Sequence, residues 1–278
     1  MTGTVRLLTG ADAPQLRHLL RSDPVSYAMV AERTAVTGVG AVLGAEVWGW
    51  YPHDDHLTAA LYLGANVVPI NADEAAVAAF ARRARMTPRR CSSIVGPAVS
   101  VIPFYDAVGD TWGIAREVRA HQPMLAIHEA PLVLPDPRVR AARMEDLDLL
   151  FPACVAMFTE ELGISPIGAD GGAAYRRRVA SLIRQGRAFL VVEDAEVLFK
   201  AEVGVVAEDV AQIQGVWVEP GHRGRHISEP CMAAVVEHAR SLFAPLISLY
   251  VNDFNQPALA SYRRVGFEQV GEFATVLY

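Results

Sequence analysis

From residue 139 to the end of the chain, apolar and polar positions follow one another in blocks typical of strands and helices. Short apolar runs predict strands, and apolar residues that recur every three or four positions predict helices. The predicted strands are 139–142, 188–193, 197–206, 211–218, 246–251 and 272–277. The predicted helices are 145–162, 173–185, 227–242 and 257–265, with a turn at 219–223. This mixed order favours an α/β or α+β fold around one central sheet.

The first half shows a similar but less regular pattern. Helices are predicted at 11–21 and 73–85, and strands at 47–51, 57–68 and 92–95. One short arrangement, a Val-Arg pair followed by Asp and Leu, occurs in both halves with identical spacing. Its copies are Val5-Arg6, Asp12 and Leu16, and Val139-Arg140, Asp146 and Leu150. Each copy predicts a strand, a turn with an Asp near a helix start, and an amphipathic helix, which indicates an internal duplication.

A proline-rich stretch separates the two halves. Pro131, Pro135 and Pro137 cannot continue a helix and suit an extended connection. The length of 278 residues also favours about two domains. We therefore predict an N-terminal domain at 1–130, a linker at 131–138 and a C-terminal domain at 139–278.

The composition is that of a globular chain, with 52% apolar residues and a net charge of −6. The negative balance argues against a nucleic-acid binder, and Lys200 is the only lysine. Cys91, Cys154 and Cys231 have scattered spacings, which favours reduced thiols over disulfides. The N-terminus lacks a secretory pattern, and the apolar runs are shorter than the roughly 20 residues that cross a bilayer. We therefore expect a cytoplasmic protein without a membrane partner.

The segment 213–232 carries the clearest chemical signal. A β-rich run through Val218 ends in a Pro-Gly turn, and a loop containing Gly and Arg then opens an apolar-periodic helix. In such geometry main-chain N–H groups at the helix N-terminus point at an anion, aided by the helix dipole. Arg223 and Arg225 add fixed positive charge suited to phosphate. The loop therefore predicts a diphosphate site, with a plain turn bearing solvated arginines as the alternative.

This strand–loop–helix unit resembles motif A of the GNAT superfamily of acyl-CoA-dependent N-acyltransferases, whose loop is written [Q/R]-x-x-G-x-[G/A]. The residues that carry the resemblance are Arg223, Gly224, Arg225, His226, Ile227 and Ser228. His226 stands where the family prefers Gly, which allows a backbone to approach a diphosphate, and Ser228 stands where it prefers Gly or Ala. The His226 ring therefore either lies on the solvent side or crowds the phosphates.

A second stretch resembles the GNAT motif B pattern N-x-x-A-x-x-x-Y-x-x-x-G-F. It matches at Asn255, Ala258, Tyr262, Gly266 and Phe267. The whole chain looks like actinobacterial GNAT proteins that carry an uncharacterised N-terminal domain. The resemblance implies two tandem GNAT-like domains, each with a mixed central sheet flanked by helices.

The resemblance also implies acetyl-CoA as the cosubstrate and assigns roles to single residues. Main-chain groups of Val216, Trp217 and Val218 are expected to hold the acyl carbonyl and the pantetheine amides. Asn255 is expected to bind the pantetheine arm, to cap a helix, or both. Tyr262 is expected to protonate the departing thiolate as a general acid, with a core aromatic as the alternative.

The general base that accepts the amine proton stays open. Gln212 and Gln214 on the motif A strand cannot serve. The carboxylates that we consider are Glu160, Glu161, Glu202 and Glu219. Direct transfer needs no enzyme nucleophile, in agreement with the lack of a Gly-x-Ser-x-Gly motif.

Two groups of residues raise the question of a metal. The first contains His222, His226 and Cys231, and the second is His53-Asp54-Asp55-His56. The first lies across the loop already interpreted as a phosphate site, and the second lies in a hairpin-like loop. We therefore expect no metal.

We interpret the chain as an N-acetyltransferase that transfers acetyl from acetyl-CoA to an amine-bearing small molecule or protein by direct attack. The alternatives are a non-catalytic acyl-CoA-binding regulatory protein and an interaction scaffold, and a homodimer is left open. We expect the first half to have lost its coenzyme site. Its nearest stretch, 93–104, has no Arg, and Pro97 and Pro103 are expected to interrupt helix formation.

Overall fold

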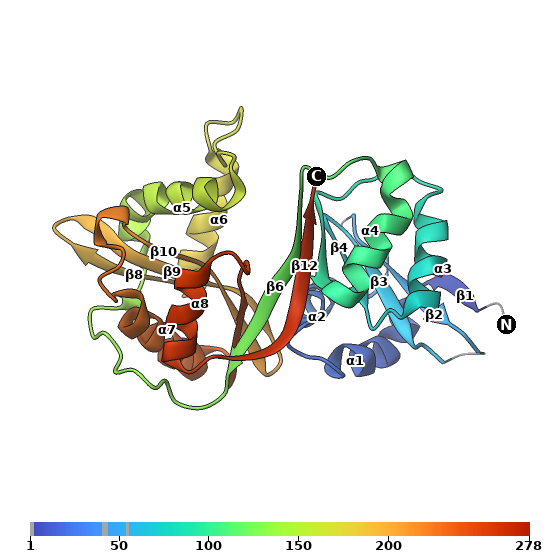
Figure 1. Cartoon of the computed structure of the whole chain (residues 1–278), viewed down its shortest axis with the longest axis horizontal. Coiled ribbons are helices and arrows are strands. Elements are labelled where there is room, and N and C mark those ends of the chain that lie inside the picture. Colours follow the sequence, from blue (N-terminus) through green and yellow to red (C-terminus); the bar gives the residue numbers. More distant parts are fainter. Residues whose placement is uncertain (1–2, 41–43, 54–55) are drawn as a thin grey trace. The chain divides into compact units, whose positions relative to one another are not determined.

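The computed structural model describes residues 3–40, 44–53 and 56–278, and its contacts divide the chain into two compact units. Unit 1 contains the described residues up to 125 together with 250–254 and 269–278. Unit 2 contains residues 126–249 and 255–268. Figure 1 follows the chain in colour from the N-terminus in blue to the C-terminus in red.

Unit 1 is built on a mixed sheet with the strand order β1-β2-β3-β4-β5-β12-β6. Its strands are β1 Thr4–Leu7, β2 Glu46–Tyr51, β3 Ala59–Leu63, β4 Asn66–Ile70, β5 Ser93–Pro97, β6 Glu117–Ile127 and β12 Glu268–Leu277. Its helices are η1 Gly10–Asp12, α1 Ala13–Arg21, α2 Ala28–Thr37, α3 Glu74–Ala84 and α4 Ala98–Trp112. The core joins β2, β5, α3 and α4 to Ala274 and Val276 of β12, so the last strand of the chain completes the first unit.

Unit 2 is built on a second run of strands in the order β11-β10-β9-β8-β7. Its strands are β7 Arg140–Ala141, β8 Ala188–Glu193, β9 Glu196–Ala207, β10 Val210–Val218 and β11 Leu246–Tyr250. Its helices are η2 Met144–Asp146, α5 Leu147–Leu162, α6 Ala173–Arg184, η3 Pro220–His222, α7 Ser228–Leu242 and α8 Gln256–Val265. Strands β10 and β11 are parallel, whereas the other pairs are antiparallel.

The helices of unit 2 cover both faces of its sheet. Phe189 of β8 stacks on His238 of α7, whereas the next residue, Leu190, packs in the cluster formed with α5 and α6. Successive side chains of a strand point to opposite faces, so α7 lies on one face and α5 and α6 lie on the other. Figure 1 shows α5 and α6 on one side of β8–β10 and α7 and α8 on the other.

The two halves of the chain repeat one order of elements. Each runs through a strand, a 3₁₀ turn, two helices, three strands, a helix, a strand, a helix and a final strand, with η3 added in the second half. Arg6 forks onto Asp12 at 2.7 and 3.0 Å, and Arg140 forks onto Asp146 at 2.6 and 2.8 Å. Each aspartate also accepts the main-chain N–H three residues before it. The spacing that indicated a duplication thus marks one charge-assisted bidentate pair built twice.

All helices and strands predicted for the second half are present, and the differences lie in the first half. The segment 57–68 forms parts of β3 and β4 rather than one strand, and α2, α4 and β6 were not predicted. The expectation that Pro97 and Pro103 interrupt helix formation was wrong. Pro97 directly precedes α4, where its missing N–H is not needed, and Pro103 lies inside the helix.

Candidate functional site

The connection between β10 and α7, residues 219–227, forms a loop lined by main-chain amides. After η3 it runs without helix or strand to Ser228. Within the described part of the chain, no hydrogen bond is made by the main-chain N–H groups of Gly224, Arg225, His226, Ile227 and Ser228. These five successive donors precede a helix of 15 residues, so they form a cradle for an oxyanion such as a diphosphate.

Two residues of this loop have left-handed backbone conformations. Gly224 has φ +75° and His226 has φ +58°. A side chain costs about 1 kcal/mol there, which is a physical reason for glycine at the position of His226. The His226 ring lies 3.0 Å from a Glu229 carboxylate oxygen, and 74% of the side chain is exposed. The structure therefore matches the alternative in which the ring lies on the solvent side.

Glu229, which the sequence analysis did not single out, is buried in the first turn of α7. Its Oε1 accepts a hydrogen bond from Arg264 Nε at 2.8 Å and forms an ion pair with Arg264 Nη2 at 2.6 Å. Burial opposes ionisation, but the hydrogen bonds from His226 and Arg264 outweigh it and lower the pKa of Glu229. The adjacent Ser228 hydroxyl lies 2.7 Å from the hydroxyl of Ser261, so two contacts tie the start of α7 to α8.

Arg223 turns toward a carboxylate of α5. Its Nη2 lies 2.7 Å from Glu160 Oε2, and its Nε donates to the carbonyl of Val218 at 3.0 Å. The indole N–H of Trp217 donates to the other oxygen of Glu160 at 3.3 Å. Two of the predicted coenzyme residues, Trp217 and Arg223, thus donate to one carboxylate of α5.

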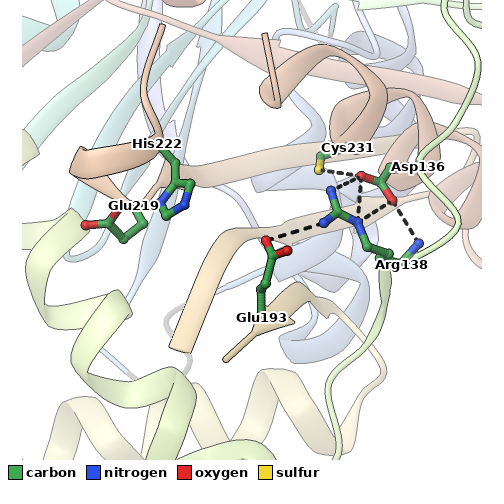
Figure 2. Close-up of polar contacts among 6 residues, drawn as sticks. All are labelled: Asp136, Arg138, Glu193, Glu219, His222 and Cys231. Atoms are coloured by element: carbon green, nitrogen blue, oxygen red, sulfur yellow. Dashed lines mark hydrogen bonds and ion pairs between the residues drawn. The ribbon is translucent and has the colours of Figure 1, made fainter. Parts of the chain in front are cut away.

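A cavity of about 380 Å³ lies beside the loop and is lined in part by Arg225. Figure 2 shows Arg138 at this place, bonded to Asp136 at 2.8 Å and to Glu193 at 3.5 Å. The other polar groups of the lining include a Glu219–His222 pair at 2.7 Å. Carboxylates outnumber cations in this lining, so the cavity is less suited to a phosphate than the amide loop.

Strand β10 is irregular where the acyl group is expected. Gln214 pairs with Glu202 and Trp217 with Lys200, so Gly215 and Val216 together face one residue of β9. Gly215 has φ +59°, as the first residue of a G1-type bulge requires. The pairing of β10 with β11 reaches only Gln212, so β10 continues beyond it to Val218 without the partner strand. A bulge leaves main-chain groups unpaired, and here it lies where the two parallel strands separate.

Beneath this bulge, on the α5 face, lies a buried charged cluster. Lys200 Nζ is 3.5 Å from Glu202 Oε2 and 3.6 Å from the sulfur of Cys154. Gln214 Nε2 donates to Glu202 Oε1 at 2.7 Å, and Arg178 lies 3.6 Å from the same oxygen. Of the carboxylates considered as the base, Glu202 is thus buried beside Lys200, Gln214 and Arg178. By contrast, Glu160 pairs with Arg223 and Glu219 pairs with His222, both nearer the surface.

Tyr262 is buried in α8 and packs edge-on against Phe267. Burial raises its pKa, and the negative charge of Glu161 raises it further. The phenol therefore keeps its proton at neutral pH, as a general acid requires. Asn255 caps α8, since its side chain accepts the N–H of Ala258 at 3.3 Å.

The histidines and the cysteine considered for metal binding face different partners. His222 lies against Glu219 and His226 against Glu229, whereas Cys231 is buried beside Asp136. Burial, followed by the charge of Asp136, raises the pKa of the Cys231 thiol to about 12. In the second group, Asp54 and Asp55 lie outside the described residues. Within the ranges that the structure describes, no group of three or more metal-binding side chains occurs.

Among the described residues, no helix combines sufficient length with sufficient apolar character to cross a membrane.

Two family profiles match the chain. Residues 170–267 match the acetyltransferase (GNAT) family, and residues 45–150 match a domain of unknown function, DUF4081. The first match contains the amide loop, the bulge and Tyr262.

Curated relatives match short segments of the chain. A segment of 61 residues is 33% identical to an uncharacterized N-acetyltransferase of Methanocaldococcus jannaschii, covering 22% of this chain and 27% of that protein. Another of 59 residues is 39% identical to the streptothricin acetyltransferase of Streptomyces lavendulae, covering 21% and 31%. The matches thus span less than a third of either relative.

Solved structures resemble the whole chain. A GNAT-family acetyltransferase from Colwellia psychrerythraea covers 99% of both chains with a TM-score of 0.60 and 12% identity. A tandem GNAT protein from the clavulanic acid biosynthesis pathway covers 99% of this chain and 98% of its own, with a TM-score of 0.52 and 13% identity. At such identities the likeness concerns the fold, and it confirms the predicted tandem arrangement of two mixed α/β domains.

Proposed function

Because residues 170–267 belong to the GNAT family of acetyltransferases, we propose that this chain transfers acetyl from acetyl-CoA to an amine acceptor by direct attack. The observation that carries the proposal is the run of five unpaired amides at the start of α7, which Arg223 precedes and which includes that of Arg225. A CoA diphosphate fits these amides because they supply donors and a favourable dipole together.

The remaining predicted residues have roles consistent with this coenzyme. Main-chain groups at Val216, Trp217 and Val218, beside the bulge, hold the acyl carbonyl and the pantetheine amides. An N–H there polarises the carbonyl and stabilises the oxyanion that forms on attack. Asn255 orients α8 as its cap and thereby sets the position of Tyr262.

Direct transfer then requires two proton movements. The acceptor nitrogen forms a bond to the thioester carbonyl carbon, and the carbon–sulfur bond breaks as the carbonyl is restored. The amine loses one proton to a base or to solvent, and Tyr262 gives its proton to the departing thiolate. The phenol of Tyr262 is protonated before transfer, as the acid role requires.

We propose that coenzyme binding belongs to the C-terminal domain, 139–278, and that the N-terminal domain, 1–130, is an accessory one. In the first half the connection from β4 to α3 contains only residues 71–73. The equivalent connection of the second half, from β10 to α7, contains residues 219–227. Asp73 of the first connection accepts the N–H of Ala76 and caps α3. A carboxylate at this helix start repels a phosphate and occupies one of the donors that it needs.

The acceptor in this proposal is an amine of a small molecule or of a protein. The streptothricin acetyltransferase relative supports a small molecule only in a general way, because the match is short. The reduced cysteines and the need for acetyl-CoA favour the cytoplasm as the place of the reaction.

Calorimetric titration with acetyl-CoA tests the coenzyme site, and release of CoA with a panel of amines tests transfer. We expect micromolar binding by the wild type, weakened about fivefold or more by Arg225→Gln. Arg240→Gln is the matched control, because Arg240 bonds the Glu129 carbonyl near the other end of α7. Binding without CoA release from any amine favours the acyl-CoA-binding regulator, and no binding contradicts the proposal.

A further inference from the structure

We propose that the Glu160 carboxylate recognises the acceptor by binding a positively charged group of that molecule. Before coenzyme binds, the guanidinium of Arg223 occupies the place of this group. The inference rests on the proposed function, since it assumes a coenzyme phosphate at the amide loop. It assigns a cationic acceptor to the α5 face of the sheet.

The first step is the position of Arg223. Its guanidinium lies on Glu160 and on the carbonyl of Val218, two acceptors that lie outside the amide loop. A carboxylate at 2.7 Å neutralises the charge that attracts a phosphate and repels the phosphate itself. Arg223 and Glu160 have 47% and 46% of their side chains exposed, so the pair separates at small cost. Coenzyme phosphate and Glu160 therefore compete for one guanidinium.

The second step is what Glu160 keeps when Arg223 leaves. The carboxylate has one donor on each oxygen, Arg223 on Oε2 and the indole N–H of Trp217 on Oε1. The indole bond remains and holds the carboxylate in place, while Oε2 loses its partner. Glu160 lies in the last turn of α5, so a ligand on Oε2 takes the place that the Arg223 guanidinium leaves.

The third step is the chemistry of that ligand. A carboxylate that has lost a guanidinium suits an ammonium or another guanidinium group, because a new charge-assisted hydrogen bond replaces the lost one. The group that now occupies Oε2 is itself a guanidinium. Trp217 is two residues from Gly215 of the bulge, so a charge bound here belongs to a part of the acceptor distinct from its attacking nitrogen. An acceptor with a second cationic group meets this arrangement.

Titration of free CoA into four proteins tests the competition: wild type, Glu160→Gln, Arg223→Gln and the double variant. An exposed ion pair contributes about 0.2–1 kcal/mol, so Glu160→Gln is expected to tighten CoA binding up to about fivefold. In the Arg223→Gln background the same change is expected to leave the affinity within experimental error. Equal tightening in both backgrounds indicates long-range charge alone and overturns the competition. No binding by any of the four overturns the proposed function as well.

Titration of the CoA-loaded protein with 5-aminopentan-1-ol, an ammonium ion at neutral pH, tests the cation site, with pentane-1,5-diol as the matched probe that lacks the charge. We expect the amino alcohol to bind the wild type at least about fivefold more tightly, and the difference to vanish in Glu160→Gln. The preference is also expected to be smaller without CoA, because Arg223 then occupies Glu160. Equal affinity of the two probes for the loaded wild type, or a preference that survives Glu160→Gln, overturns the assignment.

Discussion

Replacing Lys200 by Met tests how strongly the buried cluster beneath the bulge stabilises unit 2. The side chain of Lys200 is 2% exposed and that of Glu202 is 9% exposed. Methionine fills a similar volume without charge, so the variant leaves the Glu202 carboxylate buried and deprived of one cation. Removing one partner of a buried pair costs about 3–5 kcal/mol. We expect the lower end of that range, because Gln214 and Arg178 remain beside Glu202.

The double variant Lys200→Met, Glu202→Gln separates the charge from the packing. Neutralising Glu202 removes the uncompensated carboxylate, so the double variant is expected to be more stable than Lys200→Met by about 1 kcal/mol or more. A simple loss of packing predicts the reverse, with the second change adding to the first.

Amide hydrogen exchange of β9 and β10 in the full chain is the suitable assay, because a chain of two units need not unfold in one transition. The opening free energy of these strands is compared among the wild type, both variants and Arg184→Met, a surface control on α6. The reasoning is refuted if Lys200→Met lowers that free energy by less than about 1 kcal/mol, or if Glu202→Gln lowers it further in the Lys200→Met background.

Three further predictions concern single residues. Tyr262→Phe is expected to lower kcat about 100-fold while CoA affinity stays within twofold, since the phenol supplies a proton rather than binding energy; an unchanged kcat in single-turnover measurements contradicts the acid role. His226→Gly is expected to keep the stability within about 1 kcal/mol of the wild type, because relief of the left-handed backbone strain offsets the lost bond to Glu229. His226→Ala loses the same bond but keeps the strain, so it is expected to be less stable than His226→Gly. Equal melting temperatures of the two variants argue against strain at this residue. The bidentate hydrogen bond from Arg6 lowers the pKa of Asp12 far below its ordinary 3.8, although burial of the carboxyl opposes the shift. The native state therefore binds fewer protons than the unfolded state, and the free energy of unfolding decreases as pH falls from about 5. Asp12→Asn is expected to be less stable at pH 7 by about 2 kcal/mol but to lose less on acidification, and parallel pH profiles of urea unfolding contradict this.

The sequence predicted the strand–loop–helix unit well because its signals are local. The Pro-Gly turn, the two loop arginines and the apolar period of α7 all lie within 213–242. The partner of Glu229 was missed because Arg264 lies in another helix, and only the fold brings them together. The His226–Glu229 contact, by contrast, has the spacing of one helical turn and was accessible from the sequence.

Helix α4 was missed because proline was taken as a strict helix breaker. Pro103 removes the hydrogen bond to the carbonyl of Val99, but Val99 is 80% exposed, so water can solvate that carbonyl. The differences among the carboxylates considered as the base were equally inaccessible to sequence reasoning, since the burial of Glu202 and its contacts with Lys200 and Gln214 arise only in the fold. Local patterns predict elements, whereas the selection among chemically identical side chains depends on tertiary contacts.

The place of β12 in unit 1 bears on how the chain is synthesised. A ribosome releases the first half of unit 1 early, but Phe273, Ala274 and Val276, on the strand that pairs with β5, follow the residues of unit 2 in the chain. Until they emerge, β5 presents an unpaired edge and the apolar core lacks two of its members. Unit 1 therefore reaches its final packing only after unit 2 has been translated, which reverses the usual order in which domains fold during synthesis.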